Sequence, residues 1–312
     1  MIVFNSLEEV RNIRDTVVVL GNFDGVHMGH RKLISRAVEV AKRKNLKSAV
    51  FTFSNHPRNL IAGRIIAQSI LSQDDKIRIM KKLGVDYVFN VPFTWDICNM
   101  SPEEFVKELL VGTFKMKHAV CGFNYHYGSK AAGNPQLLEE MGGQLGYEVD
   151  MFEPVMINGN IVSSTFIRGL IETGQVDLCR RYMGERYQVK GEVVKGNQIG
   201  RTIGFPTVNQ FLDEGMVSPS NGVYVTTCTF DNKTYPSITN VGVKPTIGVY
   251  KKNVETHIFD YSGDLYGKTV VVEFLKKTRD EQKFDSFEEL KEQISKDCIV
   301  ARRFHDMYGI DI

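Results

Sequence analysis

The sequence lacks a long hydrophobic run and any pairing pattern among its cysteines. No apolar stretch approaches the roughly 18 residues that a membrane-spanning helix needs. Glu8, Glu9 and Arg11 interrupt the N-terminus before the apolar segment of a signal peptide could develop. The five cysteines are scattered and form no Cys-x-x-Cys pair, which argues against a disulfide framework and a zinc site. We therefore expect a cytoplasmic protein with reduced thiols.

A strong net charge is also missing. The 39 Lys and Arg residues are balanced by 37 Asp and Glu, which leaves a formal charge of +2. This charge is too small to predict binding to nucleic acid or to an anionic membrane by bulk electrostatics. The 312 residues, of which 42% are hydrophobic and 24% charged, suffice for two globular domains. Any phosphate chemistry must therefore depend on local residues.

The first half of the chain alternates strand-like and helix-like patterns. Residues 31–44 place apolar side chains on one helical face. Ser-x-x-acid pairs at Ser72/Asp75 and Ser101/Glu104 are typical of helix starts. The alternation predicts a Rossmann-like, doubly wound parallel sheet. The buried strands are expected at residues 16–20, 48–53, 86–91 and 118–122.

The second half changes to short β-rich stretches separated by Gly, Asn and Pro, without an internal repeat. Residues 231–233 are a short hairpin connection, and Ser286 with Glu289 caps a final helix. This pattern predicts a small antiparallel β-barrel with a terminal helix, so the fold class is α/β plus β. We expect domains at 1–184 and 185–312. The strands are expected at residues 187–194, 222–230, 234–241, 254–260 and 268–275.

A Gly- and His-containing loop follows the first strand, at residues 21–30. Doubly wound folds bind nucleotides at the carboxyl ends of their strands. Its glycines let the backbone approach a ligand, and His27 and His30 lie near a helix N-terminus, which favours anions. The spacing is not that of a dinucleotide-binding fingerprint. The loop could also be a plain turn with surface or metal-binding histidines.

A second candidate phosphate loop spans residues 196–202. It is one residue too short for a P-loop and carries Arg where that motif has Lys, so a Walker-type fold is not supported. Thr207 and Asn209 follow it and project to the same side of an extended segment. Their oxygens suit Mg²⁺, which keeps waters and phosphate oxygens as its other ligands. Both residues could equally cap or turn the chain.

Segments in both halves of the chain resemble the signatures of the prokaryotic bifunctional riboflavin kinase/FAD synthetase family. Residues 21–30 resemble its adenylyl-transferring signature, Gly-x-Phe-Asp-Gly-Val-His-x-Gly-His. Residues 163–168 match its second signature, Ser-Ser-Thr-x-Ile-Arg. Residues 200–209 resemble the riboflavin kinase signature, Gly-Arg-Thr-x-Gly-Phe-Pro-Thr-x-Asn, and downstream segments match from residue 240 to 260. The resemblance covers nearly the whole chain.

The resemblance implies two reactions that use ATP and magnesium. The barrel would phosphorylate riboflavin to FMN, and the N-terminal nucleotidyltransferase domain would join FMN to AMP, giving FAD and pyrophosphate. The implied catalytic residues are Glu255, as general base, with His27, His30 and Arg168; the metal-holding residues are Thr207 and Asn209. The implied ATP-binding residues are Gly21, Asn22, Phe23, Asp24, Gly29, Ser163, Ser164, Thr165, Gly196, Gly200, Arg201 and Thr202.

The implied flavin-binding residues come from two strand ends and one later stretch. They are Phe53, His56, Pro57, Asn124, Tyr127, Arg279 and Glu281. An isoalloxazine ring needs flat apolar surfaces with a few polar anchors. Tyr127 is a mild departure, since the family commonly has Phe there, and its ring could instead be a core aromatic on a buried strand.

Three other functions stay open at this point. The chain could be a kinase whose N-terminal domain is inactive or acts only on reduced flavin. It could be a flavin sensor without catalysis, although a sensor could dispense with Thr207, Asn209 and Glu255. It could also be a nucleotidyltransferase with a nucleic-acid-binding barrel, against which the near-neutral charge argues. We predict no nucleic-acid or membrane partner, and the sequence leaves the oligomeric state open.

Overall fold

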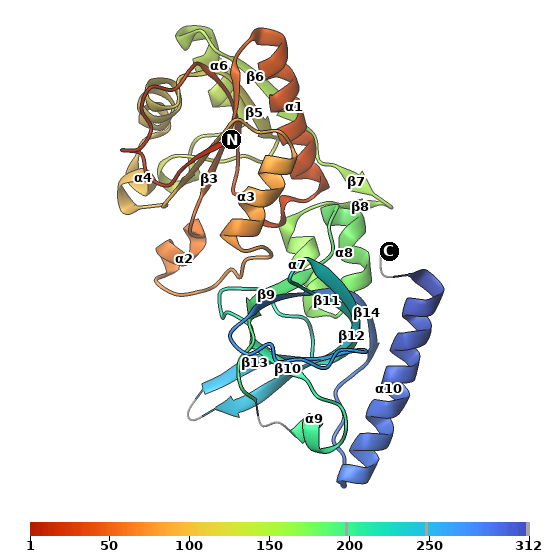
Figure 1. Ribbon diagram of the computed structural model, residues 1–312. Helices are drawn as coiled ribbons and strands as arrows, with labels where there is room; N and C mark the ends of the chain where they lie inside the picture. Colours follow the sequence, from red (N-terminus) through yellow and green to blue (C-terminus); the bar gives the residue numbers. More distant parts are fainter. Residues whose placement is uncertain (197–198, 247–248, 310–312) are drawn as a thin grey trace. The chain divides into compact units, whose positions relative to one another are not determined.

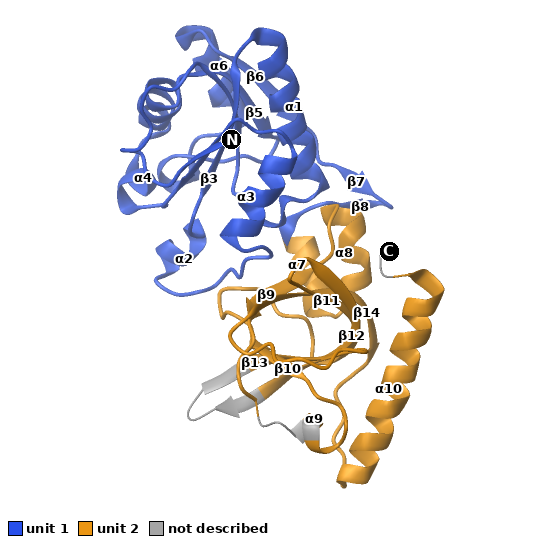
Figure 2. Cartoon of the chain, in the orientation of Figure 1, with its two compact units in different colours: residues 1–164 blue, residues 165–312 orange. Residues whose placement is uncertain are grey.

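The chain divides into two units after Ser164 (Figures 1 and 2). The computed structural model describes residues 1–196, 199–246 and 249–309, without the side chains of 199, 201, 244–246 and 249–251. Each unit has its own sheet and core and is treated separately below. Within the described ranges, no helix is both long and apolar enough to cross a membrane. All five cysteines are free.

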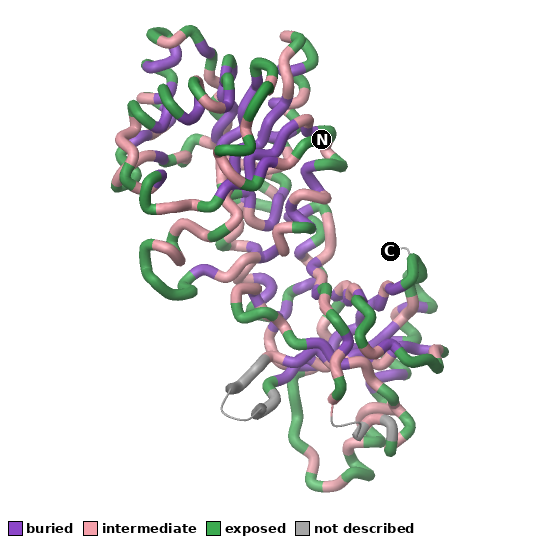
Figure 3. Tube along the Cα trace, turned by 60° about the vertical axis from the view of Figure 1, so that its left-hand side comes forward, coloured by how far each residue is buried: buried purple, intermediate pink, exposed green. Residues whose placement is uncertain are grey.

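The first unit, Met1–Ser164, is built on a six-stranded parallel sheet. Its strand order is β1-β4-β3-β2-β5-β6, which confirms the doubly wound prediction. Residues of the central strands, all of β2 and β4 among them, are buried (Figure 3). The strands are β1 (Ile2–Phe4), β2 (Thr16–Leu20), β3 (Lys47–Phe53), β4 (Tyr87–Val91), β5 (Met116–Gly122) and β6 (Glu148–Phe152).

Helices connect these strands. The longest, α1 (Met28–Lys44), contacts β2, β3 and β5 and buries Leu33, Ile34 and Ala37. The predicted start at Ser101 is a complete capping box with Glu104. The other connections are η1 (Asp24–Val26), α2 (Pro57–Ala62), α3 (Gln73–Lys82), α4 (Trp95–Asn99), α5 (Pro102–Glu104), the π-helical η2 (Phe105–Thr113), η3 (Ser129–Ala131), α6 (Pro135–Leu145) and the hairpin of β7 (Met156–Ile157) and β8 (Asn160–Ile161).

The strand order changes direction at β2, and this decides where a ligand can bind. The chain passes from β2 to β3 and β4 on one side, and then crosses to β5 on the other side of β2. Connections leaving β2 and β5 therefore diverge, and a crevice outside the carboxyl ends of neighbouring strands is where such sheets bind ligands. Residues 21–28 follow β2, and residues 123–128 follow β5. Both predicted ligand segments thus lie at this switch point.

The second unit, Thr165–Ile312, contains the predicted antiparallel barrel. Its strand order is β10-β13-β12-β11-β14-β9, and a bridge between Val194 and Asn209 brings the two edges together. The nearly closed sheet confirms the predicted class. Its elements are α7 (Ser164–Glu172, which begins in the first unit), α8 (Val176–Met183), β9 (Gln188–Glu192), α9 (Ile199–Thr202), β10 (Val208–Phe211), β11 (Gly222–Phe230), β12 (Lys233–Thr246), β13 (Val249–Ile258), β14 (Thr269–Arg279) and α10 (Phe287–Tyr308).

The β11–β12 hairpin follows directly from its turn residues. Phe230 pairs with Lys233, so only Asp231 and Asn232 form the loop. Both have positive φ, 47° and 60°, as a type I′ turn requires. Asp and Asn tolerate this left-handed conformation better than most residues, and the two-residue turn fixes the register of β11 and β12.

The terminal helix α10 is attached to the barrel by apolar packing and by ion pairs, of which the Arg279–Asp297 pair is more buried than the Arg302–Asp260 pair. Cys298 and Ala301 join the barrel core. The Arg279 guanidinium donates to both oxygens of Asp297, at 2.7 to 3.1 Å. The Asp297 side chain is only 8% exposed and also accepts from Gln293 at 2.9 Å. This carboxylate therefore connects the end of β14 to the middle of α10.

We predict that Asp297→Ala lowers the free energy of unfolding of the barrel unit by about 3 kcal/mol, because it leaves a half-buried guanidinium without its partner. Hydrogen exchange should accelerate in α10, whereas the fluorescence transition of Trp95 in the first unit should not move. Glu292→Ala is the control, since it removes an exposed pair with Lys296 on the same helix and should cost less than about 0.5 kcal/mol. Equal effects of the two variants would contradict the assignment.

Candidate functional sites

The loop after β2 has a strained backbone. Phe23 and Val26 have positive φ, 51° and 34°, beside Gly25 at 77°. Positive φ is rare for a β-branched residue such as Val26, and such strain persists only where the surroundings impose it. Strained residues of this kind concentrate at ligand sites. The backbone thus singles out the same loop that its sequence pattern indicated.

The two flanking glycines of this loop make room for aromatic rings. A Cβ on Gly21 would lie 3.2 Å from the Phe23 ring, and one on Gly29 would lie 3.2 Å from the His27 ring. Both distances are shorter than ordinary van der Waals contact. The glycines therefore let two side chains fold back onto their own loop, in addition to any close approach to a ligand.

His27 and His30 are stacked against each other, with ring centroids 3.5 Å apart and planes at 16°. His27 Nδ1 accepts a hydrogen bond from the His30 backbone N–H at 3.3 Å and caps α1. Burial lowers the pKa of His27 to about 4. Burial, with the neighbouring His27 and Lys76, also lowers the pKa of His30. Both imidazoles are therefore neutral at pH 7.

Hydrogen bonds from three other segments hold the loop in place. Thr52 Oγ1 donates to the Asn22 carbonyl at 2.9 Å, and Ile70 N–H donates to Asp24 Oδ1 at 2.9 Å. Ser164 Oγ donates to the Asp24 carbonyl at 2.9 Å. Since Ser164 belongs to the second predicted signature, the structure brings the two adenylyl-transfer signatures of the sequence together.

The other residues of the second signature lie just before α7 or within it. Ser163 precedes α7, and Thr165 is exposed in its first turn. Arg168 lies one turn further along α7, in the second unit. The loop and Arg168 are therefore described in separate units, and the role of Arg168 stays a prediction.

Lys76 is a buried cation that the sequence patterns did not single out. It is 5% exposed and is the only Lys or Arg in the buried class among the described residues. Its Nζ donates to Thr52 Oγ1 at 3.2 Å and to the Phe53 carbonyl at 2.9 Å. Burial lowers the pKa of Lys76 to about 8, against the opposing effect of Asp24. A buried cation needs such partners. Lys76 is connected to the candidate phosphate loop through Thr52, whose hydroxyl donates to the Asn22 carbonyl.

The flavin candidates after β3 have local structural partners. Phe53 ends β3, and its ring lies 5.0 Å from Phe51 and 4.9 Å from Phe93. His56 caps α2 by accepting from the Arg58 backbone N–H at 3.2 Å, and Pro57 is the first helical residue. These contacts position the segment without excluding a ligand at its surface.

The flavin candidates after β5 differ from each other in burial. Asn124 is exposed beyond the end of the strand. Tyr127 is 5% exposed and belongs to the sheet core, with its ring 5.2 Å from Phe105 and 5.7 Å from Tyr125. Burial raises the pKa of Tyr127. The structure thus gives the Tyr127 ring a packing role, whereas Asn124 remains accessible.

In the barrel, glycines bring the second candidate loop against the predicted metal-holding residues. A Cβ on Gly196 would lie 2.7 Å from the Asn209 side-chain amide, so the backbone covers that side chain. A Cβ on Gly200 would meet the Phe205 carbonyl, with Thr207 Oγ1 at 3.6 Å. Thr202 is exposed on α9. Parts of the predicted motif lie outside the described residues, namely positions 197 and 198 and the side chain of Arg201.

Glu255 faces Asn209 across the β10–β13 pair, where the two residues are register partners. Asn253 donates to Glu255 Oε1 at 2.7 Å and to Asn209 Oδ1 at 3.2 Å. The predicted base and one predicted metal-holding residue therefore share a hydrogen-bonding neighbour. The sequence indicates Asn253 only weakly, through the two-residue spacing that puts Asn253 and Glu255 on one face of a strand.

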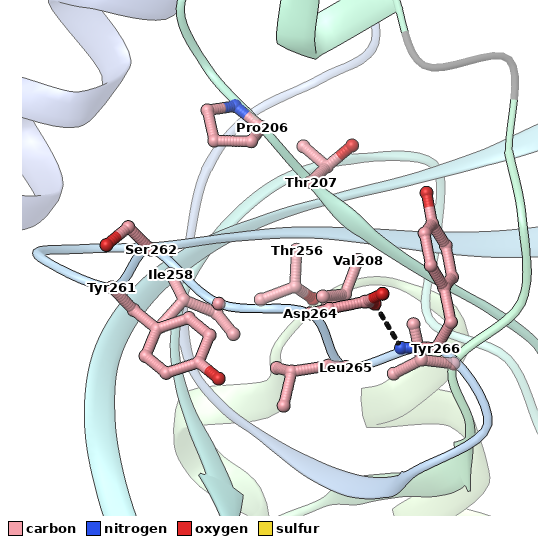
Figure 4. Close-up of a pocket in the computed structure, with 12 residues that line it drawn as sticks. Pro206, Thr207, Val208, Thr256, Ile258, Tyr261, Ser262, Asp264, Leu265 and Tyr266 are labelled. Atoms are coloured by element: carbon pink, nitrogen blue, oxygen red, sulfur yellow. Dashed lines mark hydrogen bonds between the residues drawn. The ribbon is translucent and has the colours of Figure 1, made fainter.

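A pocket of about 240 Å³ opens beside Thr207. Thr256 lines it from β13, and the segment 261–266 forms another wall. In Figure 4 the rings of Tyr261 and Tyr266 stand on opposite sides, with the Asp264 carboxylate between them. Asp264 Oδ1 accepts from the Tyr266 backbone N–H at 2.9 Å, which fixes a turn. The sequence motifs do not extend to this segment, whose residue types are ordinary for a loop.

The two remaining flavin candidates make structural contacts. The Arg279 guanidinium is engaged by Asp297, as described above. Glu281 Oε2 accepts from Asn221 Nδ2 at 2.7 Å, and Lys252 Nζ donates to Asn221 Oδ1. Glu281 therefore lies at the barrel rim near β12 and β13, while Arg279 faces α10.

Comparisons with known proteins match each half of the chain to a family. Residues 9–166 match the family described as FAD synthetase, and residues 183–305 match the family described as riboflavin kinase. The bifunctional riboflavin kinase/FMN adenylyltransferase of Bacillus subtilis (strain 168) is 34% identical over 296 residues, covering 93% of this chain and 92% of that protein. The chain belongs to this family. The Escherichia coli (strain K12) family member is 34% identical, covering 92% of each chain.

One solved structure resembles this chain over nearly its whole length. A crystal structure described as a macrolide-efflux protein from Streptococcus pneumoniae has a TM-score of 0.87 and 32% identity. It covers 96% of this chain and 98% of that chain. Its description as an efflux protein concerns that protein. The likeness concerns the fold of each unit.

We predict that acid destabilises the first unit through His27. Its folded pKa, about 4, lies below its unfolded value of about 6.5. The unfolded chain therefore binds the extra proton between these values, and stability falls as the pH drops from 6.5 to 4, by about 3 kcal/mol in full. His27→Asn should remove this part of the acid-induced loss and keep the helix cap, whereas His30, whose pKa is also lowered, keeps its own part. Urea unfolding followed by Trp95 fluorescence at pH 7.5 and 5.0 tests it, and parallel losses in both proteins would refute it.

Proposed function

We propose that the chain carries out two consecutive steps of flavin cofactor synthesis. The second unit transfers the γ-phosphate of ATP to riboflavin, giving FMN and ADP, and the first joins FMN to AMP, giving FAD and pyrophosphate. The observation that carries the proposal is that signature residues meet within each unit: Ser164 contacts Asp24, and Glu255 is paired with Asn209. The comparisons support this assignment over an inactive N-terminal domain or a flavin sensor.

In adenylyl transfer the FMN phosphate attacks the α-phosphorus of ATP, and pyrophosphate leaves. Because the substrate supplies the nucleophile, the protein's contribution is positioning and charge stabilisation. The neutral pair His27 and His30 would donate N–H hydrogen bonds to phosphate oxygens. The positive charge would come from Lys76, beneath the loop, and from Arg168. Gly21, Asn22, Phe23, Asp24, Gly29, Ser163, Ser164 and Thr165 would hold the ATP.

In the kinase reaction the Glu255 carboxylate would accept the proton of the terminal ribityl hydroxyl as the phosphate is transferred. The side-chain oxygens of Thr207 and Asn209, under the backbone of Gly196 and Gly200, form a hard donor set that fits Mg²⁺. The ion would neutralise phosphate charge when bound. The pocket beside Thr207, with its aromatic walls, suits the nucleoside part of ATP. Gly196, Gly200, Arg201 and Thr202 would hold its phosphates.

Several finer assignments belong to the same proposal. Flavin would contact Phe53, His56, Pro57, Asn124 and Tyr127 in the first domain, and Arg279 and Glu281 in the second. The functional domains would be 1–184 and 185–312, and the enzyme would work in the cytoplasm. The matched families end at residue 166 and begin again at residue 183, so α7 and α8 lie mostly between them.

Chromatography of flavins tests the proposal directly. Purified protein is incubated with riboflavin, ATP and magnesium, and in parallel with FMN or with dithionite-reduced flavin. We expect FMN followed by FAD in air. FAD formed only from reduced flavin would restrict the first site to that redox state, and binding of flavin without any conversion would overturn the enzymatic proposal.

We predict that the two activities separate by mutation. His30→Ala should reduce FAD formation from FMN at least about 100-fold, because it removes a positioned transition-state contact, while riboflavin phosphorylation stays within twofold. Glu255→Gln should have the reverse effect, with a loss of about 100-fold in phosphorylation. Both rates are measured on the same preparation, so each activity controls for folding. A parallel loss of both in either variant would contradict the two-site assignment.

A further inference from the structure

Asn253 has an unusual position in the barrel. It lies on β13 two residues before Glu255, so both side chains are on the same face of the strand. It is 2% exposed, and its register partners are Phe211 on β10 and Gly242 on β12. A Cβ on Gly242 would lie 2.8 Å from Glu281 Oε1, so the glycine makes room for that carboxylate. A buried amide at such a position needs a reason, because an apolar side chain would avoid its desolvation cost.

The contacts of the amide nitrogen point to that reason. Asn253 Nδ2 donates to Glu255 Oε1 at 2.7 Å and to Asn209 Oδ1 at 3.2 Å. A primary amide has two N–H groups, and here each meets an oxygen. A carboxylate accepts hydrogen bonds only, so the amide nitrogen, and not the oxygen, must face Glu255. The orientation of Asn253 therefore follows from its neighbours.

We propose that Asn253 is a positioning residue for phosphoryl transfer, which holds the Glu255 carboxylate and the Asn209 amide oxygen in one fixed relation. The inference rests on the proposed roles of those two residues. Asn209 Oδ1 accepts the hydrogen bond from Asn253, and this bond would orient the amide oxygen that we propose holds Mg²⁺. Hydrogen-bond partners of metal-binding side chains orient them in this way, and their loss typically costs 10- to 100-fold.

The amide oxygen of Asn253 distinguishes this positioning role from a purely structural one. Within the described part of the chain, Asn253 Oδ1 is buried without a hydrogen-bond partner. An unsatisfied buried acceptor opposes folding. Asn253 therefore gives the barrel less stability than an apolar residue of similar size would. The gain from Asn253 lies in the orientation of its two neighbours.

The test uses the isosteric pair Asn253→Val and Asn253→Thr, which suits a β-strand and differs by one hydroxyl. With Asn253→Val we expect kcat for riboflavin phosphorylation to fall about 10- to 100-fold, with KM for riboflavin within twofold and the urea midpoint of the barrel unit unchanged or higher. Asn253→Thr, which restores a donor, should regain at least about threefold. FAD formation from supplied FMN is the internal control, and Thr234→Ala, at an exposed site on β12, is the control variant.

A double-mutant cycle separates this inference from the proposed function. If Asn253 acts through Glu255, Asn253→Val should change the residual rate of Glu255→Gln by less than about twofold. A full additional loss in that background would overturn the inference. So would a wild-type rate in Asn253→Val when Glu255→Gln is impaired. A wild-type rate in Glu255→Gln would instead refute the role of Glu255 itself.

Metal binding gives a readout that does not depend on turnover. Binding of Mn²⁺ to the full-length protein in the presence of ADP, followed by electron paramagnetic resonance, should weaken about tenfold in Asn253→Val. It should be unchanged in Thr234→Ala. Equal Mn²⁺ affinity in wild type and Asn253→Val would remove Asn209 from the proposed role of Asn253.

Discussion

The reversal of strand order at β2 is the constraint on which the first unit depends. All five residues of β2 are buried, so the strand is fixed on both faces and both edges. The chain that leaves it must occupy the space between connections that diverge to either side. That space takes the loop of residues 21–28, which reaches it only through left-handed backbone at Phe23 and Val26. The surrounding hydrogen bonds from Thr52, Ile70 and Ser164 offset that strain.

In the barrel, hydrogen bonds between the two edge strands position the candidate site. The edges β9 and β10 do not form a full ladder, but Val194 N–H donates to the Asn209 carbonyl at 2.8 Å and Gln210 Nε2 donates to the Gly191 carbonyl at 3.0 Å. This closure holds Asn209 beside Glu255 while leaving Thr207 at the rim of an open pocket. In both units, the side chains of the candidate site are therefore held by elements that close a sheet or follow the end of a strand.

Sequence patterns predict the elements that depend on local chemistry. The capping box at Ser101 and the two-residue turn at Asp231 follow from side chains only a few positions apart. The edge strands β1 and β6 were not predicted. β1 has only three residues, and β6 carries Glu148 and Asp150, which pair with Lys44 and Arg36 of α1. Edge strands lack the buried apolar pattern that reveals central ones.

In the candidate sites, sequence motifs likewise predict some residues and not others. The motifs located the loops, including the pair Ser164 and Asp24, which are 140 positions apart. They could not locate Lys76 or Asn253, whose significance lies in burial beside particular oxygens and not in any spacing. Nor could they decide between surface and core for the ring of Tyr127, since an aromatic residue at a strand end suits either. Burial is a property of the folded chain, and one sequence gives it only through periodicity.

The ion pair between Arg279 and Asp297 has a consequence for engineering the C-terminus. Beyond Asp297, α10 still packs Cys298, Ala301 and His305 against the barrel, whereas Met307 and Tyr308 are exposed. A fusion partner attached after the helix therefore meets only side chains that already face water. Truncation that removes Asp297 would release the guanidinium at the end of β14 and, with it, the stretch that carries Glu281. A C-terminal truncation must therefore keep Asp297, although this residue lies 18 positions after Arg279 in the sequence.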